Sequence, residues 1–457
     1  MEKELNKILD AREQRAEIRN DFAHRGLASL SLTFNIPGYP KYNDLTKSVF
    51  DQVLNELKIF LIANRVKIRE TDLINTLDEA GHLFLVALSE NGLQLTRIKE
   101  ITETFEETFS LGRIIDVDIF DKSGRPISSG KKKKCIICGD KSAVNCMRNQ
   151  THNYEDLRTV MFSLMGDYQT KQRREFIIKK LSEISTKSLL YEVSLSPKPG
   201  LVDFHSNGSH KDMNYYTFLN STSALAPFWG TFARAGFDFK GDISQVLPLI
   251  RQIGLKAEMS MFSATNEVNT QKGLVFLLGL SVFITAYLSK EEDVFDEDRF
   301  IETIQQICHG MVDLELHDSL SNNTHGEETF KKYGLQGAGP RYEAERGFPM
   351  VFNLLLPYLE LNLNKSVLLD KEAFNGILQK ALLKIMSELD DSNVLYRKGL
   401  KMAEDLKMLA SKAFEGRHNY KKLSEFCLKE NISPGGSADI LALSLFFFFV
   451  KQELNLR

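Results

Sequence analysis

The chain is short of the residues and patterns that mark several classes of protein. It has only 5 cysteines in 457 residues, a sparse and odd-numbered set that argues against a disulfide framework and favours a reducing compartment. The two most apolar stretches, residues 274–288 and 440–450, fall short of the roughly 20 residues that a membrane span requires, and we expect both to be buried core helices. The charged start of the chain lacks the apolar centre of a secretory signal. These absences predict a cytoplasmic protein without a membrane span.

The chain also lacks a strong net charge. Its 58 basic and 61 acidic residues leave a net charge of −3, so no overall field attracts it to nucleic acid or to an anionic membrane. The one concentrated basic run, Lys131–Lys134, fits either a solvated loop or a local patch for a partner. A hydrophobic fraction of 43% is ordinary for a globular protein, and a chain of this length usually forms more than one domain.

The hydrophobic pattern changes part-way along the chain. Before residue 156, strand-like runs at 27–34, 82–88 and 112–120 alternate with helical patterns, whereas helical spacing alone continues from there to the C-terminus. We therefore predict a multidomain fold: an α+β domain (a mixed sheet with flanking helices) over residues 1–168, followed by an all-α domain over residues 169–457. The junction is expected near Gly166–Thr170, where Gly-Asp-Tyr-Gln is predicted to interrupt two helices.

Five connections of the helical half are unusually rich in Gly, Pro, Asn and ionisable residues. Functional residues concentrate in such loops, and together these segments combine carboxylates, cations and approachable backbone, which are the ingredients of a phosphate site. Any one of them is weak evidence, but five together favour an active site for a phosphate-bearing nucleotide. The five polar segments are residues 197–213, 266–273, 324–349, 390–399 and 431–439.

The first polar segment supplies both signs of charge. Lys198, His210 and Lys211 can meet phosphate oxygens, while Asp203 and Asp212 can hold a divalent cation or accept a proton.

The last polar segment opens the final predicted helix. Gly435, Gly436 and Ser437 could present free backbone N–H groups to an anion at the helix N-terminus. The structural alternative is that Ser437 and Asp439 only cap this helix and that Lys272, in the second segment, is a solvated end charge.

The polar segments contain motifs that follow one another over residues 177–448. In order and spacing they resemble the triphosphoribosyl-dephospho-coenzyme A synthases. The resemblance implies that the 2′-hydroxyl of 3′-dephospho-coenzyme A attacks the ribose C1′ of ATP and that adenine leaves, with Mg²⁺ or cations on the triphosphate. The motifs are PKPGLVD (197–203), GSHKDM (208–213), VNTQKG (268–273), RYEAERGFP (341–349), DSNV (391–394) and NISPGGSADIL (431–441).

This resemblance also implies roles for individual residues. Asp203, Asp212 and Glu343 would take the metal or base roles, and Gly435–Ser437 would form an amide cradle. The phosphates would be contacted by Lys198, His210, Lys211, Lys272, Arg341 and Arg397.

The chain departs from the family pattern at several positions. Gln271 stands where the pattern has His, Ser260 where it has Asp, and Lys398 where it has Gly, while Gly339-Pro340 resembles an insertion. A histidine at position 271 therefore cannot be essential here, and altered activity of this half stays open.

In the first domain, Asp116 and Asp118 share one face of a predicted strand, because alternate side chains point the same way. Two adjacent carboxylates suit Mg²⁺ in phosphate chemistry; the alternative is an exposed strand face. Downstream, Cys135, Cys138, Cys146 and His152 approach the spacing of a zinc site. A redox thiol pair, or small buried apolar residues, are the alternatives.

The first domain, over residues 5–165, resembles the holo-citrate lyase synthases, which are phosphoribosyl-dephospho-coenzyme A transferases. The matching elements are AREQR (11–15), SLTFNIPG (31–38), LGRIIDVDIFDKSG (111–124) and the Cys/His series with Arg148. The family's His-Pro is replaced by Phe109-Ser110, which leaves no catalytic histidine there.

The second resemblance implies that a serine of the citrate lyase acyl carrier protein attacks the α-phosphate of the triphosphoribosyl group, so that pyrophosphate leaves. Asp116 and Asp118 would hold Mg²⁺, and Arg12, Arg15 and Arg113 would contact the triphosphate. Two alternatives stay open: a prosthetic-group synthase of the malonate decarboxylase type, and a zinc-knuckle adaptor fused to a nucleotide sensor without catalysis.

Overall fold

The computed structural model describes residues 2–454 except 91, 132, 140 and 318–324. Lys132 of the basic run and Thr324 of the third polar segment lie outside the described residues. By their internal contacts the residues form two compact units, Met1–Arg173 and Arg174–Arg457. The predicted class, an α+β domain followed by an all-α domain, is confirmed.

The N-terminal unit is built on a four-stranded sheet in the order β2-β3-β1-β4. All three strand pairs are antiparallel, so the expectation of a mixed sheet was wrong. Strands β2 and β3 form a hairpin, which is necessarily antiparallel. Strand β1 runs opposite to both of its neighbours, β3 and β4, so no two neighbouring strands are parallel. The strands are β1 (Ser29–Phe34), β2 (Ile68–Asp78), β3 (Gly81–Leu88) and β4 (Ile115–Phe120).

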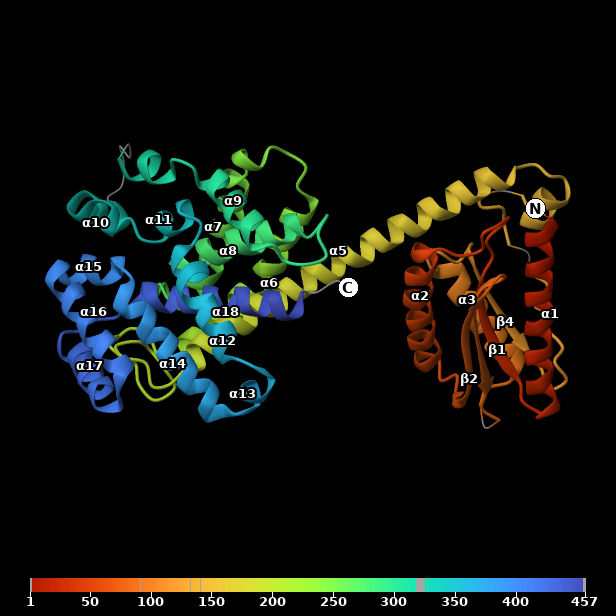
Figure 1. Ribbon diagram of the computed structural model, residues 1–457, viewed down its shortest axis with the longest axis horizontal. Helices are drawn as coiled ribbons and strands as arrows, with labels where there is room; N and C mark the ends of the chain where they lie inside the picture. The colour runs from red at the N-terminus through yellow and green to blue at the C-terminus, as the bar shows by residue number, and fades with distance from the viewer. Residues whose placement is uncertain (1, 91, 132, 140, 318–324, 455–457) are drawn as a thin grey trace. The chain divides into compact units, whose positions relative to one another are not determined.

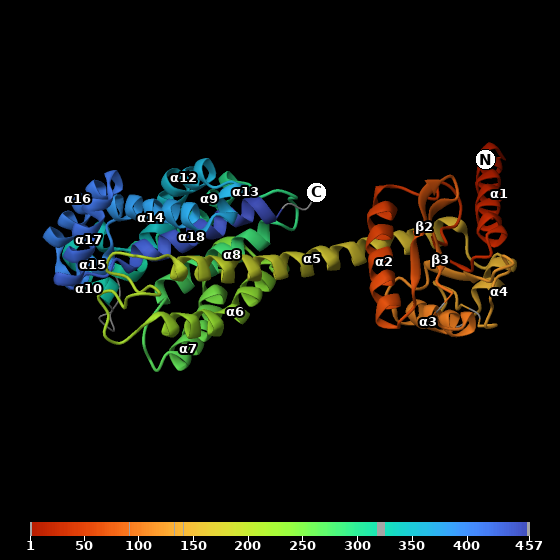
Figure 2. The same cartoon turned by 90° about the horizontal axis from the view of Figure 1, so that it is seen from below.

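Helices cover both faces of this sheet (Figures 1 and 2). One face packs on α2 (Asp44–Ala63) and α3 (Leu95–Thr108), with Phe50, Phe84 and Phe105 in the core. The other face packs on α1 (Glu2–His24) through Phe22 and partly buried Ile18. A short helix, α4 (Ala143–Arg148), follows the first two cysteines of the Cys/His series.

The outer edge of β4 is occupied by side chains. The Val117 N–H donates to Glu106 Oε1 at 2.6 Å, and the Val117 carbonyl accepts from Lys99 Nζ at 2.9 Å. The Ile115 carbonyl accepts from Lys133 Nζ at 2.6 Å. These bonds satisfy backbone groups that an edge strand otherwise leaves open.

Helix α5 (Tyr154–Ser194) runs unbroken for 41 residues. The interruption expected at Gly166–Thr170 was therefore wrong. A single glycine costs a helix only about 1 kcal/mol, and the segment contains no proline to remove a backbone donor. A Cβ on Gly166 would meet no atom within 4 Å, so this glycine serves no close contact.

The C-terminal unit is helical, and α18 (Gly435–Glu453) runs through its middle (Figures 1 and 2). This helix has the length and hydropathy of a membrane span, but 67% of that window is buried inside the unit. With α8 (Lys272–Leu288), it confirms the two apolar stretches as core helices. The other helices are α6 (Tyr215–Asp238), α7 (Leu247–Ala264), α9 (Glu297–Cys308), α10 (His325–Tyr333), α11 (Pro340–Glu345), α12 (Leu356–Asn362), α13 (Lys365–Leu369), α14 (Lys371–Glu388), α15 (Ser392–Lys398), α16 (Leu400–Glu415) and α17 (Arg417–Lys429), with short turns η1 (Ile243–Gln245), η2 (Asp313–His317), η3 (Gly334–Gly337) and η4 (Met350–Leu355).

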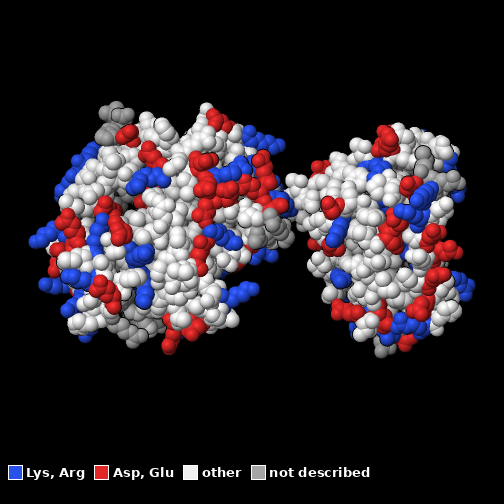
Figure 3. Space-filling model, in the orientation of Figure 1, with Lys and Arg blue, Asp and Glu red and all other residues white. Residues whose placement is uncertain are grey.

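On the face seen in Figure 3, neither sign of charge covers a whole unit. Figure 3 shows basic and acidic side chains interspersed on the visible face of each unit, as the small net charge of −3 leads one to expect. Specific binding of a charged ligand therefore depends on local cavities.

Candidate active sites

All five polar segments meet at one cavity of the helical unit. Its volume is about 240 Å³, and each segment contributes side chains or backbone to its wall. The segments are far apart in sequence, so only the packing of the helices brings them together. In chain order, the lining residues from the polar segments are Lys198, Leu201, Val202, His210 and Met213, then Asn269–Gly273, then Gly326 and Pro340, then Ser392, Asn393 and Arg397, and finally Ser433, Gly435, Gly436, Ala438 and Asp439.

Lys198 lies in the cavity wall as one half of a buried ion pair. Its Nζ lies 2.6 Å from Glu192 Oε1 and also donates to the Glu192 carbonyl at 3.0 Å. The two side chains are only 2% and 5% exposed. A buried charge needs its partner, so most of the Lys198 charge is balanced before any phosphate enters.

Asp203 organises the loop and does not line the cavity. Its Oδ2 accepts from the Lys198 amide at 2.8 Å, and its Oδ1 accepts from the amides of His205 and Ser206 at 2.8 and 3.0 Å. Both oxygens are thus committed to the backbone of one turn. This geometry favours a loop-forming role for Asp203 over the metal or base role predicted from the sequence.

His210 connects the first and last polar segments. Its Nε2 lies 2.7 Å from Ser433 Oγ, and its Nδ1 lies 3.7 Å from Asp212 Oδ1. Burial lowers the pKa of His210, and the charge of Arg397 lowers it further. Asp212 is 63% exposed and Lys211 is exposed as well, and neither lines the cavity.

A second cavity of about 310 Å³ adjoins the first, and the two share Lys272, Gly273 and Pro340. Arg341, a predicted phosphate ligand, lines the second cavity and bonds Glu315 Oε2 through its Nε at 2.8 Å. Arg251 of α7 pairs with the other oxygen of the same carboxylate. Sequence reasoning missed Arg251 because it lies inside a helix, outside every motif.

The N-terminus of α18 is not an open amide cradle. The Ser437 N–H donates to Asp391 Oδ2 at 2.9 Å, and the Gly436 amide interacts with the same carboxylate. The Gly435 N–H donates to the Ser433 carbonyl at 3.0 Å. The predicted phosphate cradle at Gly435–Ser437 is therefore corrected: an internal carboxylate already fills the anion site that a helix N-terminus provides.

A small cavity of about 20 Å³ adjoins the main one, and four carboxyl groups line it: Glu343, Asp390, Asp391 and Asp439. Burial raises the pKa of Glu343 to about 7, and its Oε2 has no hydrogen-bond partner within the described part of the chain. Burial raises the pKa of Asp439 well above its ordinary value, and the nearby charges of Asp391 and Glu192 add to the effect.

Two of the positions that depart from the family pattern, Gln271 and Ser260, have structural partners. Gln271 is buried, and its Oε1 accepts a hydrogen bond from Ser221 Oγ at 2.9 Å. Ser260 Oγ lies 3.4 Å from the Ala224 carbonyl. Pro340, from the apparent insertion, lines both larger cavities.

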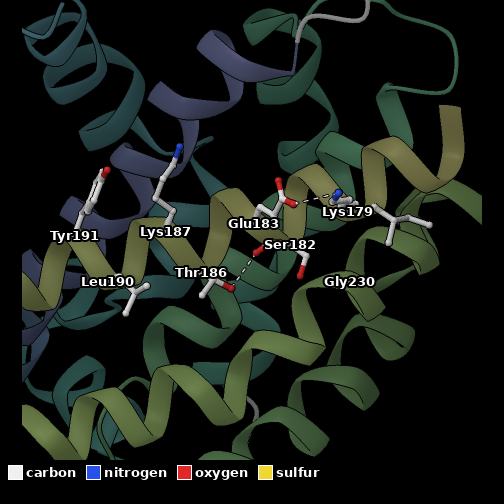
Figure 4. A pocket seen from close by; sticks show the side chains of 9 residues that line it. Lys179, Ser182, Glu183, Thr186, Lys187, Leu190, Tyr191 and Gly230 are labelled. Atoms are coloured by element: carbon white, nitrogen blue, oxygen red, sulfur yellow. Dashed lines mark hydrogen bonds and ion pairs between the residues drawn. The ribbon is translucent and has the colours of Figure 1, made fainter. Parts of the chain in front are cut away.

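A shallower groove of about 600 Å³ runs along α5 and reaches Gly230 of α6 (Figure 4). Its walls include an ion pair of Lys179 with Glu183 at 3.8 Å. It contains no residue of the five polar segments, so its larger volume does not make it the active site.

In the N-terminal unit, Asp116 and Asp118 share one face of β4, opposite Thr33 and Ser31 of β1. Lys133 Nζ lies 3.1 Å from Asp116 Oδ1. Burial and the charge of Asp116 raise the pKa of Asp118, while Lys99, Lys133 and Arg19 act in the opposite direction. Lys133 of the basic run is therefore paired at this carboxylate site.

The predicted triphosphate arginines do not gather around the two aspartates. Arg15 is buried and forms a double hydrogen bond to Asp78 at 2.7 and 2.8 Å. This contact fastens α1 to the β2–β3 hairpin and favours a structural role for Arg15 over the triphosphate role predicted from the sequence. Arg12 is exposed. The electrostatic neighbours of Arg113 are Cys135 and Glu106.

Arg19 is the arginine that interacts with Asp118. Its guanidinium lies 5.3 Å from the centre of the Phe120 ring. Sequence reasoning missed it, although its position four residues after Arg15 places it on the same face of α1.

Cys135, Cys138, Cys146 and His152 come together, with one ligand atom of each within 4.8 Å of the others. The Cys138 and Cys146 sulfurs are 3.6 Å apart, and all are free thiols. The buried His152 Nε2 has no hydrogen-bond partner among the described residues. Three thiols and one imidazole are the donor set of a tetrahedral structural zinc site.

Comparison with known proteins gives two family matches, one for each part of the chain. Residues 178–457 match the family described as ATP:dephospho-CoA triphosphoribosyl transferase. Residues 3–168 match the family described as apo-citrate lyase phosphoribosyl-dephospho-CoA transferase. Full-length relatives join the same two parts. The protein CitXG of Leuconostoc mesenteroides subsp. cremoris is 32% identical over 97% of this chain and 96% of its own length.

The chain belongs to the CitXG family of fused enzymes. These enzymes make the citrate lyase prosthetic group and attach it, so both predicted enzyme activities are confirmed at the level of the family. The CitXG protein of Haemophilus influenzae is also 32% identical, over 97% of this chain and 95% of its own length. A probable 2-(5''-triphosphoribosyl)-3'-dephosphocoenzyme-A synthase of Streptococcus mutans is 36% identical over 62% of this chain and 99% of its own length.

Proposed function

We propose that residues 169–457 join the triphosphoribosyl group of ATP to the 2′-hydroxyl of 3′-dephospho-coenzyme A and release adenine. The observation that carries this proposal is the convergence of the five polar segments on one cavity. The adjoining cavity around Arg251 and Arg341 gives room for a second phosphorylated substrate. Two connected cavities with cationic walls suit a reaction between two nucleotides.

The phosphate groups would be held mainly by cations that line the cavities. Lys272 reaches both cavities, and its Nζ lies 3.1 Å from Glu258 Oε2. Arg397 lines the first cavity, and Arg341 lines the second with Arg251. Guanidinium groups form paired hydrogen bonds to phosphate oxygens, so binding of a triphosphate would pull Arg341 and Arg251 from their shared carboxylate.

In the N-terminal unit, residues 1–168 would transfer phosphoribosyl-dephospho-coenzyme A to a serine of the citrate lyase acyl carrier protein, with loss of pyrophosphate. Asp116 and Asp118 would hold Mg²⁺, which would neutralise charge on the phosphates. Lys99, Lys133 and Arg19 surround the two carboxylates with positive charge. Lys133 can move from Asp116 to a phosphate oxygen when the metal binds.

The Cys/His cluster would hold a structural Zn²⁺. A bound metal would satisfy the unpartnered His152 Nε2 and fix the loop that carries Lys133. The purified protein is expected to contain one zinc per chain by atomic spectroscopy, and Cys138→Ser is expected to lose it. A substoichiometric zinc content in freshly purified wild-type protein would exclude this site.

We propose a cytoplasmic location for the protein, and each activity has a direct test with the purified protein. Incubation with ATP, 3′-dephospho-coenzyme A and Mg²⁺ is expected to release adenine, detected by chromatography. Addition of the purified carrier protein is expected to raise its intact mass by one phosphoribosyl-dephospho-coenzyme A group. Absence of adenine contradicts the synthase function, and absence of the mass gain with preformed precursor contradicts the transferase function.

A further inference from the structure

We propose that Asp439 is the group that accepts the proton of the attacking hydroxyl in the helical unit. This inference rests on the proposed synthase function. The sequence resemblance implied acid roles for Asp203, Asp212 and Glu343. Asp439 lies within one of the motifs, but it was considered only as a possible helix cap, so the geometry points to a residue without a predicted acid role.

The other acidic candidates are less well placed for this role. Glu343 lines the small cavity but not the main one. Asp203 bonds the backbone of its own loop, and Asp212 lies outside the cavity lining. Asp391 is bound to the amides of α18. Among the described residues that line the main cavity, the carboxylates are Glu192 and Asp439, and Glu192 is neutralised by Lys198.

Asp439 has the position and freedom that a proton acceptor needs. It lies in the first turns of α18 and lines both the main cavity and the small cavity that adjoins it. It is half-buried, and no hydrogen bond from a described residue holds its carboxylate. Gly273, in the first turn of α8, leaves room for the Asp439 carboxylate, because a Cβ on this glycine would lie 2.6 Å from Asp439 Oδ2.

The surroundings of Asp439 adjust its protonation. Burial is the main reason that the pKa of this carboxyl lies well above its ordinary value, and the charges of Asp391 and Glu192 contribute. A raised pKa makes this carboxylate a stronger base once it is ionised. The charged and titratable side chains that share the two cavities with it are Glu192, Lys198, His210, Lys272, Glu343, Asp390, Asp391 and Arg397.

The proton transfer can be written as a balanced step. The C1′–N9 bond of ATP breaks and its electron pair leaves with adenine, while an oxygen lone pair of the 2′-hydroxyl forms the new O2′–C1′ bond. The hydroxyl proton moves to the Asp439 carboxylate. Adenine takes a proton at nitrogen from water, and Asp439 returns its proton to water.

The test is Asp439→Asn in the full-length chain, which keeps the shape of the side chain and removes its basic oxygen. The kcat for adenine release is expected to fall by about 10²- to 10⁴-fold, while the Kd for ATP changes by less than about threefold. Asp439→Ala removes the whole carboxylate and leaves room for a small one, so added formate is expected to restore part of its activity. Glu404→Gln, an exposed change on α16, is the control and is expected to keep wild-type kcat.

The outcomes separate this inference from the proposed function. If the wild-type chain releases no adenine, the synthase function itself is wrong. If the wild type is active and Asp439→Asn keeps more than a tenth of its kcat, Asp439 is not the proton acceptor. If the variant loses both its activity and its ATP binding, and formate does not restore the activity, the role of Asp439 is purely structural. If Asp439→Asn does not fold, the wild-type pH profile decides: kcat/KM must fall as the pH is lowered through the Asp439 pKa, and a flat acidic limb overturns the proposal.

Discussion

Gly273 lies so close to Asp439 that a methyl group added to the glycine would overlap the carboxylate: its Cβ would lie 2.6 Å from Asp439 Oδ2. Gly273 lies in the first turn of α8 and Asp439 near the N-terminal end of α18, and the two helices pack against each other in the core. The glycine therefore leaves the space that the carboxylate occupies in the cavity wall.

Gly273→Ala is expected to lower kcat for adenine release by about 10-fold or more, because the carboxylate must move from its place and misplacement by about 1 Å is costly. Kinetic assay of the purified variant measures this. Gly376→Ala is the matched control, since a Cβ at that helical position meets no atom within 4 Å. The control is expected to gain up to about 1 kcal/mol of stability with unchanged kcat. Equal kcat for both variants would contradict the role given to Gly273.

The buried pair of Lys198 and Glu192 predicts strong non-additivity. Lys198→Met alone is expected to lower the free energy of unfolding by about 3–5 kcal/mol, because it leaves a buried carboxylate without its partner. The double variant Lys198→Met/Glu192→Leu is expected to be more stable than either single variant. Urea unfolding followed by circular dichroism gives all four values, and additive losses would show that the pair does not interact.

Arg251 offers a test of the second cavity. Arg251→Met is expected to raise KM for ATP by about 10- to 100-fold, since hydrogen bonds to charged groups contribute about 1.5–3 kcal/mol. Its kcat is expected to change much less. Arg234→Met, an exposed arginine outside both cavities, serves as control. A rise in the KM for 3′-dephospho-coenzyme A instead of ATP would assign this cavity to the other substrate.

Glu343 predicts a dependence of stability on pH. Its folded-state pKa is about 7, above the ordinary 4.5, so ionisation is less favourable in the folded state and stability falls as the pH rises from about 4.5 to 7. The full shift corresponds to at most about 3 kcal/mol. Glu343→Gln removes this loss, so its Tm is expected to match the wild type near pH 4.5 and to exceed it at pH 8. A constant difference in Tm across this range would contradict the shift.

Asp118 tests the N-terminal unit by itself. Asp118→Asn is expected to slow the mass gain of the carrier protein by on the order of 100-fold or more, because it removes a proposed metal ligand. The release of adenine by the helical unit is expected to be unchanged. Glu13→Gln, on the exposed side of α1, provides the control. Loss of both activities in Asp118→Asn would instead indicate misfolding.

Elements with regular hydrophobic periodicity could be predicted from the sequence. Strands β1, β3 and β4, and helices α8 and α18, lie where the sequence predicts them because each buries one face or all of its surface. Strand β2 has no such pattern: it lies at the sheet edge, most of its side chains are exposed or half-buried, and a bulge interrupts it between Arg69 and Leu73. A polar edge strand gives no alternation to detect.

The sequence predicted which loops form the candidate site of the helical unit, but it predicted the roles of individual residues less well. Composition and motifs located the segments that meet at the cavity, because ionisable residues among glycines are visible in a sequence. The partner of each charge is not visible, since it depends on tertiary packing. Thus Arg15 is paired with Asp78, and the amides of α18 are occupied by Asp391. Arg251 and Arg19 lie inside helices and were missed for the same reason.

The side chains that satisfy the outer edge of β4 limit how this unit can meet a protein partner. Lys99, Lys133 and Glu106 occupy the hydrogen-bonding groups that an incoming strand would need. A carrier protein cannot dock here by extending the sheet, as many peptide ligands do on open edges. At this edge, recognition of the proposed carrier protein would have to use side chains, and two copies of the unit cannot associate by pairing their β4 strands.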